Sequence, residues 1–187
     1  MNNPEWTRVI ALRDPKDRIL SAYLGKEYRF HTKPRRASSV FRKACFNYKC
    51  GEFELSDNIK DCMHHNYTFS EFLDVIQNCR NVHWDPQHTL IDDWECVNFV
   101  INFNDLARGA EKLLRKLGDD VWETFGKTGW GLNGTSAVFQ ENTHHSSGAS
   151  DKYNEFYTPE IEKIVEKMYA CDYDLLRKYF PEDYKKD

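Results

Sequence analysis

The stretch WTRVIALRDPKDRILSAYLGKEY, residues 6–28, carries the main evidence for the fold. Its first part, residues 6–12, is short, apolar and rich in β-branched side chains, which is typical of a buried strand. Pro15 follows at a position that suits the first turn of a helix. Apolar residues then recur at helical spacing, which predicts a helix over residues 16–28. The stretch is therefore expected to form a strand, a tight turn and a helix, with an arginine at the end of the strand.

The turn between this strand and this helix has the features of a phosphate-binding site. Backbone N–H groups and the positive end of the helix converge there, which suits an anion. Arg13, at the end of the strand, can form paired hydrogen bonds with phosphate oxygens. Ser21, in the second turn of the helix, can add a hydroxyl. The alternative is a helix with a solvated serine and an Arg13–Asp14 arrangement at the surface, because many α/β turns look similar.

The rest of the chain predicts three further helices and one further strand. Residues 68–79 begin with a Thr-x-x-Glu capping box and continue with apolar residues at helical spacing. Residues 95–103 are typical of a second strand, and a helix capped by Asn104 and ended by Gly118 is expected to follow. A last helix is expected to start at Thr158 and to end near residue 170, before an aromatic tail. The expected core face of the middle helix consists of Leu106, Ala110, Leu113, Leu114 and Leu117.

The order of these elements indicates one α/β domain over residues 1–187. Strands that alternate with helices favour a parallel sheet. Residues 31–66 are expected to form an irregular, cysteine-rich insertion, and residues 127–150 a long loop of the kind that tends to be functional or disordered. Two parallel strands do not make a stable sheet with two covered faces. Either the pattern leaves further strands unrecognised or the domain is incomplete at its N-terminus, and we favour the second explanation.

Composition excludes some classes of function. The chain has 187 residues, with 26 Lys and Arg against 30 Asp and Glu, and a net charge of -4. This balance argues against a general nucleic-acid binder, which usually carries a basic excess. The sequence has no apolar run that approaches the roughly 18 residues of a membrane helix, and its first residues do not resemble a signal peptide.

The six cysteines favour disulfides in a secretory compartment, although their spacing does not give the pairing. Two sequons, at Asn66 and Asn133, would be glycosylation acceptors there. The alternative is a zinc site built from Cys45, Cys50 and the Cys-Met-His-His segment at residues 62–65. That spacing fits no common structural zinc pattern, so we expect disulfides or buried thiols and no metal.

Four segments resemble the Golgi carbohydrate sulfotransferases of the chondroitin, dermatan and HNK-1 type. The sequence RDPKDRILSAY, residues 13–23, resembles the motif with which that family binds a 3′-phosphate. NVHWDPQ, residues 81–87, resembles its His-Trp-x-Pro-Gln segment. Residues 96–118 and 149–176 resemble its second strand with the following helix and its C-terminal Tyr-Thr-Pro-Glu helix. The segments occur in the order of the family and span about residues 6–180.

The resemblance implies a fold related to nucleotide kinases and a sulfuryl transfer reaction. The implied donor is 3′-phosphoadenosine 5′-phosphosulfate (PAPS), and the implied acceptor is a hydroxyl of a carbohydrate. Arg13 and Ser21 match the ligands of the donor's 3′-phosphate. Ser146, Ser147 and Gly148 lie where family members close over the nucleotide, and a flexible loop is the alternative there.

His83 and Trp84 match the segment that would form a wall of the acceptor site, with a simple packed loop as the alternative. We expect Arg18 to be structural. The family also has an earlier strand with a Lys-rich turn for the 5′-phosphosulfate and a catalytic base after it, which would lie before Trp6. The catalytic residues are therefore left unassigned, and the chain alone is expected to be inactive. Five histidines could replace the base, and the sequence prefers none of them: His31, His83, His88, His144 and His145.

Two other functions fit the sequence less closely. One is a relative that binds the nucleotide without catalysis. The other is a disulfide-linked luminal module that binds a glycan through a basic run, although such runs are usually just solvated. The residues of that run are Lys33, Arg35, Arg36, Arg42 and Lys43. The resemblance itself implies the Golgi lumen, with a membrane anchor upstream.

Overall fold

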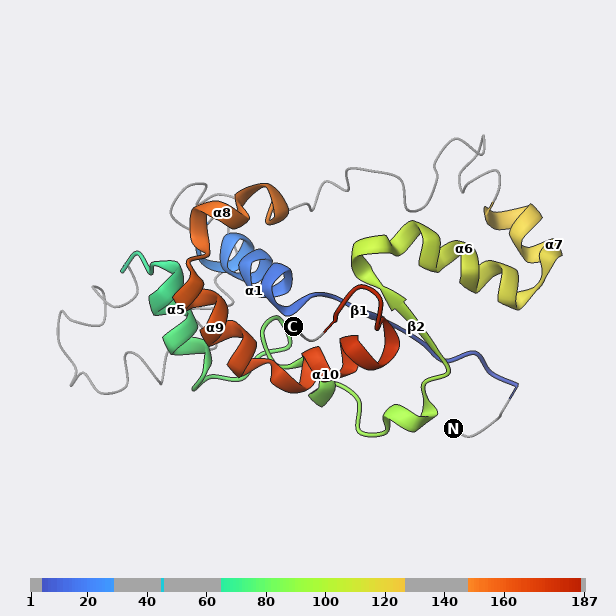
Figure 1. Ribbon diagram of the computed structural model, residues 1–187, viewed down its shortest axis with the longest axis horizontal. Helices are drawn as coiled ribbons and strands as arrows, with labels where there is room; N and C mark the ends of the chain where they lie inside the picture. Colours follow the sequence, from blue (N-terminus) through green and yellow to red (C-terminus); the bar gives the residue numbers. More distant parts are fainter. Residues whose placement is uncertain (1–4, 29–44, 46–64, 127–147, 186–187) are drawn as a thin grey trace. The chain divides into compact units, whose positions relative to one another are not determined.

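The computed structural model describes residues 5–28, 45, 65–126 and 148–185 of the chain (Figure 1). The chain divides into two compact units, and each is described here by itself. The first unit comprises Met1–Asp14, Ile91–Ser146 and Leu175–Asp187, and the second comprises Pro15–Leu90 and Ser147–Asp174. The single-domain organisation expected from the sequence stays a prediction. Most of the cysteine-rich insertion and of the long loop before residue 150 lies outside the described residues.

A parallel pair of strands forms the sheet of the first unit. β1 (Val9–Leu12) lies beside β2 (Phe99–Asn102), and the register pairs the first residue of one strand with the first residue of the other (Figure 1). The carbonyl of Arg8 accepts hydrogen bonds from the N–H groups of Asn98 and Phe99, at 3.2 and 3.1 Å, just before the ladder. Both strands are shorter than predicted. Parallel strands with helices confirm the α/β class.

Helix α6 (Leu106–Leu117) follows β2 and packs against it. Gly109 allows the close approach, because a Cβ at that position would overlap the side chain of Ile101 in β2. Gly118 ends the helix with a φ of 152°, as predicted. The predicted cap was wrong: the side chain of Asn102 accepts from the N–H of Asn104 and caps a short 3-10 turn that precedes α6.

The predicted core face of α6 is mostly not buried. Ala110 is 4% exposed, whereas Leu117, at the end of the helix, is 51% exposed. The other three leucines of that face are half-buried. Helical periodicity located the apolar face of α6 correctly, but periodicity does not say how much of that face the neighbouring elements cover.

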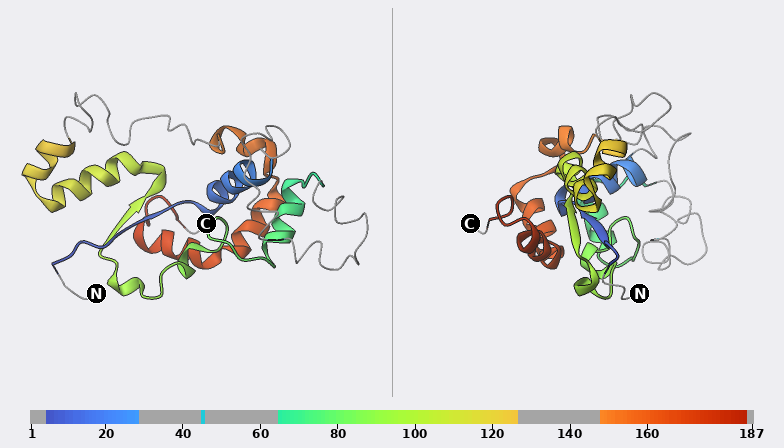
Figure 2. Two further views of the ribbon diagram at one scale, coloured as in Figure 1. Left: turned by 180° about the vertical axis from the view of Figure 1, so that it is seen from behind. Right: turned by 90° about the vertical axis from the view of Figure 1, so that its right-hand side faces the viewer.

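Helix α1 (Pro15–Tyr23) is central to the second unit. It continues as one π-helical segment (Leu24–Tyr28) and packs against three other helices. These are α5 (Phe69–Ile76), α8 (Tyr153–Phe156) and α9 (Pro159–Met168), and Figure 2 shows the group from two further sides. The predicted helix at residues 16–28 is thus confirmed, with a change of helical type after Tyr23.

An aromatic cluster forms the core of this unit. The ring of Tyr23 lies 5.2 Å from that of Phe69 and 5.4 Å from that of Phe72, measured between centroids. Phe156 meets Tyr23 edge-on at 5.5 Å. Such tilted and edge-on pairs are the favourable geometries for aromatic rings. The sequence of α1 therefore contributes its apolar face to a dense core, which fixes the position of the helix.

Two local signals begin helices of the second unit as predicted. Thr68 caps α5 with the full capping box, in which its hydroxyl accepts from the N–H of Glu71 and the Glu71 carboxylate accepts from the N–H of Thr68. Thr158 caps α9 by accepting from the N–H of Ile161. The expected aromatic tail is wrong in part, because residues Ala170–Tyr179 form a further helix, α10, which contains a boundary between the two units.

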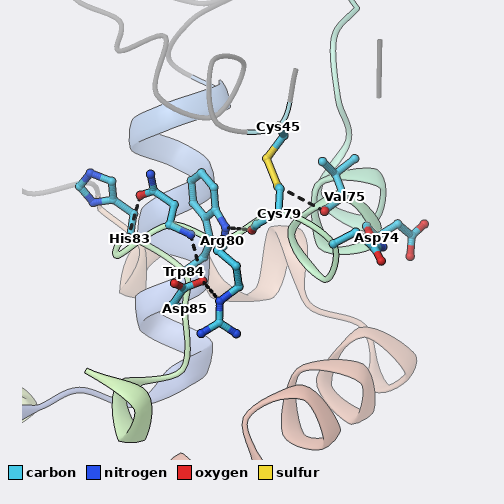
Figure 3. Close-up of a disulfide and its surroundings, with 10 residues drawn as sticks. Cys45, Asp74, Val75, Cys79, Arg80, His83, Trp84 and Asp85 are labelled. Carbon is cyan, nitrogen blue, oxygen red and sulfur yellow. Dashed lines mark hydrogen bonds and ion pairs between the residues drawn. A yellow bond between two sulfur atoms is a disulfide. The ribbon is translucent and has the colours of Figure 1, made fainter. Parts of the chain in front are cut away.

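One disulfide joins Cys45 to Cys79 across 34 residues of sequence, with the Cα atoms 5.4 Å apart (Figure 3). This pair was among the cysteines expected to form disulfides, although the sequence did not give the pairing. Cys96 and Cys171 are thiols. Cys50 and Cys62 lie outside the described residues. Because Cys45 is oxidised, it is not available as a thiolate ligand for zinc.

The remaining described elements are short. They are 3-10 turns at Gln87–Thr89, Trp94–Cys96, Phe103–Asp105 and Ser150–Lys152, the single helical turn α7 (Asp119–Val121), and a π-helical turn at Trp122–Gly126.

Candidate functional site

Arg13 stands directly after the last residue of β1, in the first unit. Its side chain is half-buried, and its guanidinium carbon lies 5.1 Å from the centroid of the Phe103 ring. A guanidinium can stack on an aromatic face and still direct its planar array of N–H donors toward an anion. The packing on Phe103 therefore restricts the position of the guanidinium.

Ser21 lies in α1, in the second unit, and is half-buried. Neighbouring contacts fix the helix that carries it. The hydroxyl of Tyr157 donates to the carbonyl of Lys16 at 2.7 Å. Because Arg13 and Ser21 belong to different units, their joint contact with one phosphate stays a prediction.

Lys16 connects the start of α1 to α9 through two ion pairs. Its ammonium lies 3.2 Å from a carboxylate oxygen of Glu162 and 2.6 Å from one of Glu166. Burial lowers the pKa of Lys16, but the hydrogen bonds to Glu166 and Glu162 outweigh it and hold the pKa above its usual range. Lys16 is therefore charged, and its ion pairs link the start of α1 to α9 inside the second unit.

Trp84 lies in the core rather than at a surface. It is 1% exposed, its indole N–H donates to the carbonyl of Cys79 at 2.7 Å, and its own carbonyl accepts from the hydroxyl of Tyr169 at 2.6 Å. The indole meets the ring of Phe72 edge-on. This position corresponds to the packed-loop alternative for Trp84. An acceptor role for Trp84 would have to act through the residues that it supports.

His83 precedes Trp84 and points in a different direction (Figure 3). Its side chain is half-buried, and its backbone N–H donates to the side-chain oxygen of Asn81 at 3.1 Å. Burial, followed by the positive charges of Lys26 and Arg18, lowers the pKa of His83. The lowered pKa favours the neutral imidazole of His83, which can both donate and accept a hydrogen bond with a hydroxyl group.

Two charged residues hold the loop that carries His83. The guanidinium of Arg18 donates to the carbonyl of Asp85 at 2.7 Å and to that of Val82 at 2.8 Å. This agrees with the structural role expected for Arg18. From α10, the carboxylate of Asp172 accepts hydrogen bonds from the N–H groups of Gln87, at 2.7 Å, and His88, at 2.8 Å.

Asp172 also contacts the ring of His88, with 2.9 Å between Oδ1 and Nδ1. Sequence analysis missed Asp172, because 84 residues separate the two partners in the chain. The signal in the sequence was an aspartate placed among apolar side chains in the segment CDYDLL, at residues 171–176.

Gly148 adopts a φ of 64°, which strongly favours glycine. The chain turns there, and the following Ala149 is buried. The backbone conformation at residue 148 therefore explains why a glycine is present there. Ser146 and Ser147, the other residues predicted to close over the nucleotide, lie outside the described residues. The nucleotide-binding role of this segment stays a prediction.

In the part of the chain that the structure describes, no three His, Cys, Asp or Glu side chains are grouped so that they could hold a metal ion. Nor does any described helix combine the length and the apolar composition needed to cross a bilayer.

Comparison with known proteins identifies the family. The model of the sulfotransferase family matches residues 1–179. Because the match covers most of the chain, the chain belongs to the sulfotransferase family, whose members transfer a sulfuryl group to an acceptor. The parallel strands with their helices are consistent with the P-loop-like fold of such enzymes. No curated protein and no solved structure matched the chain.

Proposed function

We propose that the protein transfers a sulfuryl group from PAPS to a hydroxyl of a carbohydrate. In this reaction the bond between the sulfur and the bridging oxygen of the donor breaks, and a bond forms between the sulfur and the acceptor oxygen. The hydroxyl proton passes to a base, and 3′-phosphoadenosine 5′-phosphate (PAP) leaves. Support comes from the family match over residues 1–179 and from the four segments that resemble carbohydrate sulfotransferases.

The observation that carries the donor part of the proposal is the connection between β1 and α1. Only Arg13 and Asp14 separate the end of the strand from the first residue of the helix. The first N–H groups of a helix have no partner within the helix and attract anions. We propose that Arg13 and Ser21 bind the 3′-phosphate of PAPS, and that Gly148 with Ser146 and Ser147 closes over the nucleotide.

For the acceptor part we propose that His83 contacts the carbohydrate. Its half-buried, neutral imidazole suits a hydrogen bond to a sugar hydroxyl. Trp84 contributes indirectly in this proposal, because its buried indole fixes the backbone on which His83 stands.

We further propose that the protein works in the Golgi lumen, anchored to the membrane by a segment outside this chain. The disulfide between Cys45 and Cys79 supports an oxidising compartment. Asn66, in the first sequon, is exposed and accessible for a glycan. Mass spectrometry of alkylated protein from a secreting cell would show this disulfide and a glycan on Asn66, whereas free Cys45 and Cys79 would contradict the assignment.

A transfer assay tests the proposed reaction. Because residues 1–187 alone are expected to be inactive, the full-length protein is incubated with ³⁵S-labelled PAPS and desulfated chondroitin, and label in the polysaccharide is measured. We expect transfer that falls when Arg13 is replaced by alanine and that persists when Arg108, an exposed arginine of α6, is replaced. Binding of PAP without transfer to any carbohydrate would instead favour the inactive, nucleotide-binding relative.

A further inference from the structure

We propose that Arg18 and Asp172 are positioning residues that hold the acceptor loop, defined as residues 81–88, in the geometry that acceptor binding requires. This inference rests on the proposed function, because it assigns a task to the loop that carries His83. All of the contacts involved lie within the second unit.

The acceptor loop begins with a turn that is closed by its own hydrogen bonds. The carbonyl of Asn81 accepts from the N–H groups of Trp84, at 3.0 Å, and Asp85, at 2.7 Å. The carboxylate of Asp85 accepts in return from the N–H of Asn81 at 2.9 Å. These bonds satisfy N–H groups of the turn, whereas the outward carbonyls of Val82 and Asp85 need partners from elsewhere.

Arg18 supplies those partners. Its two terminal nitrogens donate separately to the carbonyls of Val82 and Asp85, which flank His83 in the sequence. A planar guanidinium fixes the distance and the angle between two acceptors, which a lysine ammonium does not. Arg18 therefore sets the orientation of the turn on which the imidazole of His83 stands.

Asp172 holds the other end of the loop with the opposite charge. Its carboxylate is buried and accepts from the N–H groups of Gln87 and His88, which begin the 3-10 turn Gln87–Thr89. It also meets Nδ1 of the His88 ring. A carboxylate at this position satisfies N–H groups that have no partner inside the turn. Arg18 thus holds the first part of the loop through its carbonyls, and Asp172 holds the last part through its N–H groups.

The position of Arg18 relates the acceptor loop to the proposed donor site. Arg18 lies three residues before Ser21 in α1, and residues with this spacing are neighbours on a helix surface. The helix that carries the proposed phosphate ligand therefore also carries the residue that orients the acceptor loop. Small errors in the relative position of two reactants are costly, since a displacement of about 1 Å can reduce a rate roughly 100-fold.

The test compares Arg18→Met with Arg18→Lys and with the control Arg80→Met. Arg80 is a matched control, because it pairs with the Asp85 side chain of the same loop but is 70% exposed and contacts no loop carbonyl in the described hydrogen bonds. The measurements, all on the full-length protein, are the KM and kcat for desulfated chondroitin with PAPS, the Kd of PAP by calorimetry, and hydrogen exchange of the loop N–H groups.

For Arg18→Met we expect the acceptor KM to rise about tenfold or more, with a PAP Kd within about twofold of the parent value and faster exchange at Trp84 and Asp85. Arg18→Lys should recover part of the loss, because one carbonyl keeps a charged donor. Arg80→Met should behave as the parent does. If Arg18→Met does not fold, Asp172→Asn replaces it, with faster exchange expected at Gln87 and His88 and the same rise in KM.

The inference is overturned if the acceptor KM and the loop exchange stay at parent values, or if PAP and acceptor binding weaken together. Failure of the proposed function looks different. The parent protein would then bind no PAP or transfer no sulfate. In that case hydrogen exchange alone would test whether Arg18 holds the loop. Faster loop exchange in Arg18→Met but not in Arg80→Met supports the holding role, and equal exchange in both refutes it.

Discussion

The two units of the molecule differ in how their apolar residues are used. In the second unit, α1 and α5 bury nearly all of their apolar side chains in one aromatic cluster, and a disulfide adds a covalent link. In the first unit, β1 and β2 are four residues each, and α6 buries only Ala110 of its apolar stripe fully. Five of the eight exposed large hydrophobic residues in the described chain belong to the first unit.

The elements that define the fold class and the core that stabilises the protein therefore lie in different units. The parallel strands that define the α/β class, and Arg13 at the end of one of them, belong to the thinly packed unit. The residues that fix Ser21 and His83 belong to the densely packed one. We therefore expect substitutions in the second unit to affect stability far more than comparable substitutions in the first.

The largest difference is expected for a core aromatic residue against an exposed leucine. Phe72 is 0% exposed and contacts Tyr23 and Trp84, so Phe72→Ala should lower the free energy of unfolding by about 3–5 kcal/mol. Leu117→Ala, on the exposed end of α6, should change it by less than about 0.5 kcal/mol. Urea unfolding followed by circular dichroism measures both. Equal losses for the two variants would remove the contrast between the units.

The disulfide should come next in magnitude. The bond closes a loop of 34 residues, and the loss of conformational entropy in the unfolded chain corresponds to roughly 3.8 kcal/mol. Thermal unfolding of Cys79→Ser should show this loss. Cys96→Ser is the control in the first unit, because Cys96 is a thiol whose hydrogen bond to the Asp93 carbonyl a serine can keep. A loss as large in Cys96→Ser would show that thiol packing, rather than the disulfide, is responsible.

A smaller difference is expected at the starts of two helices. Thr68 caps α5 with its side chain, whereas Asp105 precedes α6 without a side-chain hydrogen bond to the helix. Thr68→Ala should therefore cost about 1 kcal/mol, Thr68→Ser should keep most of that stability, and Asp105→Ala should cost about 0.5 kcal/mol or less. Chemical denaturation of the three variants measures their free energies of unfolding. Equal losses in Thr68→Ala and Asp105→Ala would contradict the assignment of Thr68 as the cap.

Sequence analysis predicted the elements whose signals are local. Pro15, the capping box at Thr68 and the Thr158-Pro159 start each act within one helical turn, so neighbouring residues suffice to indicate the helix. Gly118 ended α6 for the same reason. Strand lengths were overestimated, because apolar residues near a strand remain apolar whether or not a partner strand pairs with them.

The features that were missed depend on distant partners. The segment that forms helix α10 was expected only as an aromatic tail, because its aromatic and charged residues show no strong apolar stripe. The contacts of Asp172 with Gln87 and His88 and the burial of Trp84 arise only when segments far apart in the sequence meet. The residue types of the candidate site were therefore visible in the sequence, whereas the residues that support them were not.

The most direct test of the central claim is the affinity for PAP compared with that for adenosine 5′-phosphate, which lacks the 3′-phosphate. Calorimetry should show that Arg13→Ala weakens PAP binding by roughly 1.5–3 kcal/mol, the value of a charge-assisted hydrogen bond, and leaves adenosine 5′-phosphate unaffected. Arg108→Ala, an exposed arginine of the same unit, should leave both affinities unchanged. If folded Arg13→Ala binds PAP as tightly as the parent protein does, Arg13 does not bind the 3′-phosphate and the account is wrong.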